Sequence, residues 1–179
     1  MSIILEAAAH ILEQHGFEGY TTNSIAERAG ASIGSLYQYF PGKDAITIAL
    51  IEQESALLLD AVVKAARMED WADALRSMIR AATEHQLTRP KLARLLDFEE
   101  ARLPFPAHAV RVASTIHAAI VEVLKKRPER SSEDIAVLAS DILAITRALT
   151  DSAGERGETD IGELERRVIR AVFGYLERS

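Results

Sequence analysis

Three polar side chains interrupt the apolar faces of three consecutive predicted helices, where they could bind a ligand. Glu99 lies four residues after Leu95 in a leucine stripe, and Gln86 continues an apolar line that includes Met78. His117 interrupts the apolar face of the next helix. Burying such groups without partners is costly, so a shared pocket that pairs them with a ligand is one solution. The pattern predicts Met78, Gln86, Glu99 and His117 as ligand-binding residues.

The alternative is that each polar group pairs with a protein neighbour, such as Arg102 or Arg147 for Glu99. His85 and His108 are expected at the surface. No set of His, Asp and Glu has the spacing of metal ligands, so neither a metal nor another cofactor is predicted. The sequence also lacks a Ser/His/Asp or two-carboxylate constellation and a phosphate loop, which argues against an enzyme.

Composition limits the remaining classes of protein. The chain has 179 residues, of which 48% are hydrophobic, enough for a packed core in one or two domains. The absence of cysteine excludes disulfides and thiolate metal sites and fits the reducing cytoplasm. Uninterrupted apolar runs fall far short of the ~20 residues that span a bilayer, and the first residues do not resemble a secretory signal. We expect a cytoplasmic protein without a membrane partner.

The charge distribution opposes nucleic-acid binding at first sight. The formal net charge is −6, and residues 1–60 hold two cations, Arg28 and Lys43, against eight carboxylates. Basic side chains that neutralise phosphates normally supply most of the nonspecific affinity for DNA. Any DNA contact made by this region must therefore rely on hydroxyls, backbone groups and few charges.

Glycine and proline are sparse, and no run of β-branched residues alternates with polar ones, which predicts an all-α chain. About nine helices are expected, the eighth following a cap at Ser131 or Ser132 and ending before a polar loop over 154–160. Their approximate ranges are 2–15, 23–29, 33–39, 43–66, 71–88, 90–103, 107–126, a helix ending near 153, and 161–177.

Two short helices with a tight turn between them are predicted from residues 22 to 43. Ala26 supplies a small side chain where the helices approach, and Gly30 supplies the turn, where a positive φ is expected. Ile25 and Leu36 have the spacing that seats both helices on the first helix. This is the pattern of a helix-turn-helix.

The run TTNSIAERAGASIGSLYQYFPGKDA, from Thr21 to Ala45, resembles the DNA-binding signature of the TetR family. The resemblance covers about residues 3–55, whereas the rest matches only in the number and length of helices. It implies a three-helix DNA-binding domain over 1–45, a connecting helix over 43–66, and a ligand-sensing and dimerisation domain over 46–179. Family members usually carry a basic extension before the first helix, and only Met1 and Ser2 precede it here.

The resemblance also implies which residues contact DNA. Residues at the start of the recognition helix would touch bases or nearby phosphates, and a glycine would let the backbone approach the groove. Gln38 can pair with adenine and Ile33 can meet a thymine methyl group. Tyr39, Thr22 and Lys43 would contact phosphates. The full set is Thr22, Ser32, Ile33, Gly34, Ser35, Tyr37, Gln38, Tyr39 and Lys43, with packing as the alternative for the two tyrosines.

The last two predicted helices are apolar on more than one face, so each must pack against other helices on two sides. In the resembled family the corresponding helices pair with their two-fold mates in a four-helix bundle. The stripes predicted at the dimer interface are Ile135, Leu138, Ile142, Ile145 and Leu149, followed by Leu164, Val168 and Val172. The second stripes comprise Val137, Ala144 and Ala148, followed by Ile169, Phe173 and Leu176. A charge at Ile142 or Val168 is accordingly predicted to break the dimer.

Together these features predict a one-component transcriptional repressor of the TetR type. Its homodimer would bind a palindromic double-stranded DNA operator and be released by a small-molecule effector. The alternative is a TetR-fold DNA-binding protein without a small-molecule ligand, controlled by a protein partner or serving an architectural role.

Overall fold

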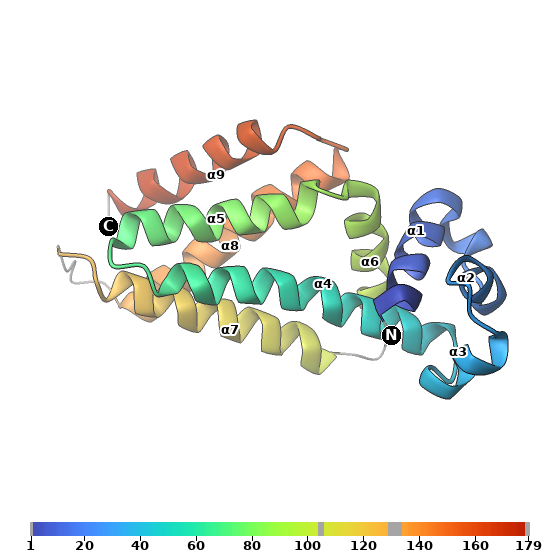
Figure 1. Ribbon diagram of the computed structural model, residues 1–179. Coiled ribbons are helices and arrows are strands. Elements are labelled where there is room, and N and C mark those ends of the chain that lie inside the picture. The colour runs from blue at the N-terminus through green and yellow to red at the C-terminus, as the bar shows by residue number, and fades with distance from the viewer. Residues whose placement is uncertain (1, 104–105, 129–133, 178–179) are drawn as a thin grey trace. The chain divides into compact units, whose positions relative to one another are not determined.

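A computed structural model describes residues 2–103, 106–128 and 134–177, and this part of the chain is helical with no strand (Figure 1). The all-α prediction is confirmed. The described helices are α1 (Ser2–Gly19), α2 (Thr22–Arg28), α3 (Ile33–Tyr39), α4 (Lys43–Ala66), α5 (Trp71–Leu87), α6 (Pro90–Arg102), α7 (Pro106–Leu124), α8 (Ile135–Glu155) and α9 (Ile161–Leu176).

The chain divides into two compact units that each have their own apolar core. The first comprises Met1–Glu54 and Lys91–Pro106, and the second Ser55–Pro90 and Ala107–Ser179. Helix α4 contributes its first half to one unit and its second half to the other. Most of α6 belongs to the first unit, because Leu92 and Leu96 are buried in the same cluster as the side chains of α1 to α3.

Local sequence explains how α2 and α3 begin and end. Thr21 caps α2, and its hydroxyl accepts from the Ser24 amide at 3.1 Å, while the Ser24 hydroxyl accepts from the Thr21 amide in return. Gly30 has a φ of 65°, as predicted, so the chain turns sharply after α2. Ser32 then caps α3 by accepting from the Ser35 amide at 3.0 Å.

In the second unit α5, α8 and α9 pack against one another (Figure 1). Their core also takes in the last turns of α4, where Val62 and Ala65 are buried, and one face of α7. Within the described residues, Ala107–Leu124 in α7 is long and apolar enough to cross a membrane, with a mean hydropathy of 1.3. Two of its apolar side chains, those of Val123 and Leu124, are buried in this core, where they contact protein rather than lipid.

Two predictions about α8 need correction. The helix begins at Ile135, and Asp134 caps it by accepting from the Ala136 amide at 2.9 Å. The predicted caps, Ser131 and Ser132, lie outside the described residues. The helix also continues through Gly154, which is buried, to Glu155, so the polar loop starts later than predicted.

The apolar stripes assigned to the dimer interface are mostly core. Five of the eight predicted residues are at most 4% exposed in the single chain: Leu138, Ile142, Leu164, Val168 and Val172. Their own chain already covers these side chains, so they expose little surface that a partner could contact. Ile135, Ile145 and Leu149 are half-buried against the same core. The second stripe of α8 is the exposed one, with Val137 at 54% and Ala144 and Ala148 also at the surface.

The turn between α2 and α3 yields a stability prediction. A Gly30→Ala variant must hold an L-residue at positive φ, which costs about 1–2 kcal/mol. Gly34 lies within α3, where an added Cβ meets only ordinary contact, so Gly34→Ala should be neutral or stabilise by about 0.5–1 kcal/mol. Urea unfolding of both variants checks this, and equal midpoints would contradict a strained turn.

Candidate nucleic-acid interface

Helix α3 separates buried from exposed side chains. Leu36 is fully buried and Phe40 is 5% exposed, whereas Tyr37 and Tyr39 are 51% and 61% exposed. Both tyrosines therefore lie at the surface rather than in the core. The other predicted base-contacting residues are exposed or half-buried on the same short helix and its cap, namely Ser32, Ile33, Gly34, Ser35 and Gln38.

Hydrogen bonds between side chains order this surface. The hydroxyls of Thr22 and Tyr37 are 3.3 Å apart and join the start of α2 to α3. The hydroxyls of Ser32 and Ser35 are 2.8 Å apart at the start of α3. Each hydroxyl can still donate to or accept from a base or a phosphate. The structure therefore brings most of the predicted DNA-contacting residues together on α2 and α3.

Lys43, the remaining predicted contact, is exposed at the start of α4 with its Nζ atom 5.9 Å from the centre of the Tyr20 ring. Tyr20 itself is 1% exposed, and burial raises its pKa to about 12. The buried Thr47 hydroxyl lies 3.2 Å from the Tyr20 hydroxyl and donates to the Lys43 carbonyl at 3.1 Å. Tyr20 was not singled out in the sequence, because an aromatic residue after a glycine has no pattern of its own.

Glu99 has a protein partner. Arg102 donates to both of its carboxylate oxygens, at 3.0 and 2.6 Å, and to Asp44 at 2.8 Å. These bonds, with Glu99 first and Asp44 second, hold the pKa of Arg102 above its usual range. Of the two readings of Glu99, the ion pair with Arg102 is therefore the one observed.

The other predicted sensor residues, Met78, Gln86 and His117, belong to the second unit. Met78 is 5% exposed in the core. The His117 Nε2 atom is 3.0 Å from the Ala136 carbonyl oxygen and 3.2 Å from the Ser140 hydroxyl, so the imidazole is bound by α8.

Gln86 is 7% exposed and is one of the buried polar residues of the second unit. It lies against Gly154 of α8, where an added Cβ would be 2.4 Å from the amide nitrogen. The absence of a side chain at Gly154 makes room for this amide.

His108 was expected at the surface and is 3% exposed instead. Its Nδ1 atom is 2.9 Å from the Arg111 guanidinium, and its Nε2 atom is 3.1 Å from the Ser55 hydroxyl. Because guanidinium only donates, Nδ1 must be the accepting nitrogen and Nε2 the protonated one. Pairing on both sides removes the cost that made burial unexpected. His85 is half-buried, and burial lowers its pKa.

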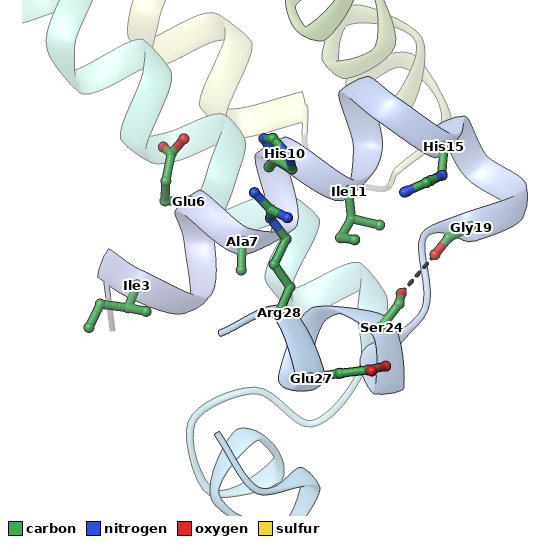
Figure 2. A pocket seen from close by; sticks show the side chains of 10 residues that line it. All are labelled: Ile3, Glu6, Ala7, His10, Ile11, His15, Gly19, Ser24, Glu27 and Arg28. Carbon is green, nitrogen blue, oxygen red and sulfur yellow. Dashed lines mark hydrogen bonds between the residues drawn. The ribbon is translucent and has the colours of Figure 1, made fainter. Parts of the chain in front are cut away.

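A groove of about 900 Å³ runs between α1 and α2 in the first unit (Figure 2). Its lining mixes apolar side chains with charges of both signs, including Glu6, Glu27 and Arg28. The Ser24 hydroxyl donates to the Gly19 carbonyl at its edge. No pattern in the sequence predicts this groove, because its lining comes from two helices and depends on how they pack.

The exposed polar face of α3 and the turn that joins it to α2 form a helix-turn-helix, which is typical of DNA-binding transcription regulators, and the described part of the second unit is helical as well. Two family models extend over most of the chain. One, "Bacterial regulatory proteins, tetR family", matches residues 4–50, and the other, "Tetracyclin repressor-like, C-terminal domain", matches residues 70–176. The chain belongs to the TetR family.

Individual relatives share fewer than half of their aligned residues with this chain. Nucleoid occlusion factor SlmA of Haemophilus influenzae is 29% identical over 153 residues, 79% of this chain and 69% of SlmA. The HTH-type transcriptional regulator RutR of Escherichia coli is 40% identical over 98 residues, 54% of this chain and 45% of RutR. The structure of the fatty acid degradation regulator FadR from Bacillus halodurans superposes with a TM-score of 0.78 over 97% of both chains, at 18% identity. These relatives are named as regulators or as a nucleoid factor, and none as an enzyme.

The burial of Gln86 yields a prediction about stability. Gln86 is 7% exposed, and an apolar side chain of similar shape is less costly to bury than an amide, so Gln86→Leu should leave the free energy of unfolding unchanged or raise it by up to about 1 kcal/mol. The matched control, Gln14→Leu, changes an exposed residue of α1 and should shift it by less than about 0.5 kcal/mol. Thermal and urea unfolding measure both, and a destabilised Gln86→Leu would mean that the amide has a partner.

Proposed function

We propose that the protein is a ligand-responsive repressor whose homodimer binds a near-palindromic DNA operator. The observation that supports this proposal is the set of exposed side chains on α3, together with Thr22 before it and Lys43 after it in the sequence. As a two-fold dimer, the chain would present two such helices to half-sites about 34 Å apart. Such a protein acts in the cytoplasm, where the DNA is.

The acidic charge of the first unit is compatible with this proposal if most contacts are not made by formal charges. Two capped helix starts, at Thr21 and Ser32, offer backbone amides. The hydroxyls of Tyr37 and Tyr39 add further donors, as expected for phosphate contacts. The expected consequence is modest affinity with strong dependence on the few cations.

The effector is proposed to bind in the second unit, where Gln86 offers an amide and Met78 an apolar contact. Glu99 is not proposed as a direct ligand, because its carboxylate is already paired with Arg102. Helix α4 runs without interruption from Lys43 to Ala66, so an effector that displaces its second half would alter the DNA-contacting half. A hundredfold loss of operator affinity requires that the effector favour the released state by about 2.7 kcal/mol.

The relative SlmA favours a second candidate function. Its name, nucleoid occlusion factor, describes a role other than control of one operator by a small molecule. The corresponding proposal for this chain is a DNA-binding protein controlled by a protein partner or serving an architectural role. DNA binding that no small molecule alters, in the presence of a stable protein partner, would favour this alternative.

The DNA proposal is tested with duplexes that the chain itself selects from a random pool of about 30 base pairs, a length that holds two half-sites. We expect enrichment of a near-palindrome. Tyr39→Ala and Lys43→Ala should weaken binding to selected and random duplexes alike, because they remove phosphate contacts. Gln38→Ala should cost about 1–3 kcal/mol on the selected duplex only. Equal losses on both duplexes would remove Gln38 from base recognition.

The dimer is proposed to form through the exposed stripe of α8, where Ala144 and Ala148 allow close approach of a second copy. Ala148→Asp should produce folded monomers in sedimentation experiments, while Ala118→Asp, at an exposed alanine of α7, should leave the dimer intact. Val168 is fully buried, so Val168→Asp should lower the free energy of unfolding by more than about 3 kcal/mol. An intact Ala148→Asp dimer would place the interface elsewhere.

A further inference from the structure

We propose that Arg102 is a positioning residue for DNA binding: it pairs with Asp44 and Glu99 near Lys43 and offsets part of their negative charge, so that the start of α4 can accept a phosphate. The inference rests on the proposed DNA contact of Lys43 and adds a residue to it that lies outside the helix-turn-helix signature. Arg102 is at the end of α6, 58 residues from Asp44 in the sequence, and both belong to the first unit.

The geometry fixes the guanidinium in place. Its Nε and Nη2 atoms donate to the two oxygens of Glu99 at 3.0 and 2.6 Å, which is a bidentate fork. The Glu99 side chain is 6% exposed, and a buried carboxylate depends on such an ion pair. Glu99 therefore holds the guanidinium in a fixed position. The same Nη2 atom then reaches the Asp44 carboxylate at 2.8 Å. Lysine, a point charge without a fork, could not hold both carboxylates in this way.

Both carboxylates lie near Lys43. Asp44 is the next residue, and the Lys43 ammonium stands over the Tyr20 ring. Glu99 is joined to Asp44 through Arg102, whose Nη2 atom donates to Glu99 at 2.6 Å and to Asp44 at 2.8 Å. Burial is the main cause that raises the Tyr20 pKa, and the charges of Glu99 and Asp44 also raise it. Lys43, Asp44, Glu99 and Arg102 together carry no net charge, and loss of Arg102 would leave the group at −1.

That balance matters in this chain because cations are scarce in its first 60 residues, where only Arg28 and Lys43 oppose eight carboxylates. A carboxylate without its partner would lie within the Debye length, about 10 Å at 0.1 M salt, of a phosphate bound at Lys43. The repulsion would cancel much of the attraction that Lys43 supplies. Arg102 thereby keeps the two carboxylates from outweighing the charge of Lys43, without needing to touch DNA.

The test measures binding of the full chain to its selected duplex by fluorescence anisotropy, from about 50 to 200 mM salt. Arg102→Gln should weaken binding about threefold to tenfold at low salt, and the difference should shrink as salt rises. Adding Asp44→Asn to Arg102→Gln should restore most of the affinity, because it removes the stranded charge. The matched control is Arg94→Gln, an equal loss of charge at an exposed position of α6, which should change affinity by about twofold or less.

Circular dichroism establishes that each variant is folded. If Arg102→Gln unfolds because Glu99 is left buried and charged, the comparison is made in Glu99→Gln/Arg102→Gln, with and without Asp44→Asn. The inference is overturned if loss of Arg102 weakens binding no more than Arg94→Gln, or if Asp44→Asn restores nothing, since the contact would then be only structural. If no duplex is enriched from the pool, it is the proposed DNA-binding function that fails.

Discussion

The protein's DNA-binding surface depends on the burial of a few apolar side chains beneath two helices that are too short to be stable alone. Helices α2 and α3 have seven residues each, whereas isolated helices shorter than about 12–15 residues are marginal in water. Ile25 and Leu36 are completely buried in the core of the first unit. Without that core, neither the turn at Gly30 nor the exposed face of α3 would have a defined geometry.

This core also determines what α4 and α6 contribute. Ile46 and Leu50 bury the first half of α4 among the same side chains, while Leu92 and Leu96 bring in α6. Packing α6 in the first unit places Arg102 within reach of Asp44, although the two are far apart in the sequence. Apolar burial thus sets up an ionic contact, and the ionic contact in turn sets the charge around Lys43.

The effect of the acidic composition on DNA binding therefore depends on where the charges lie as well as on the net charge. Carboxylates near the proposed DNA surface matter less when a cation is paired with them, and Arg102 is paired with both Asp44 and Glu99. Exposed hydroxyls and helix starts supply the remaining contacts that a basic patch would otherwise make. A DNA-binding unit can therefore have few cations, provided that their fields are not cancelled locally.

Local structure follows from the sequence alone: the bounds of α4, the positive φ of Gly30, the cap at Ser32 and the helix-turn-helix depend on near neighbours and helical periodicity. Which apolar stripe of α8 faces inward depends on tertiary packing, because periodicity marks an apolar face without telling what covers it. That is why Ile142, predicted at an interface, lies in the core. Tertiary packing likewise determines the partners of Arg102 and His108, since Asp44 approaches Arg102, and Ser55 approaches His108, from distant parts of the chain.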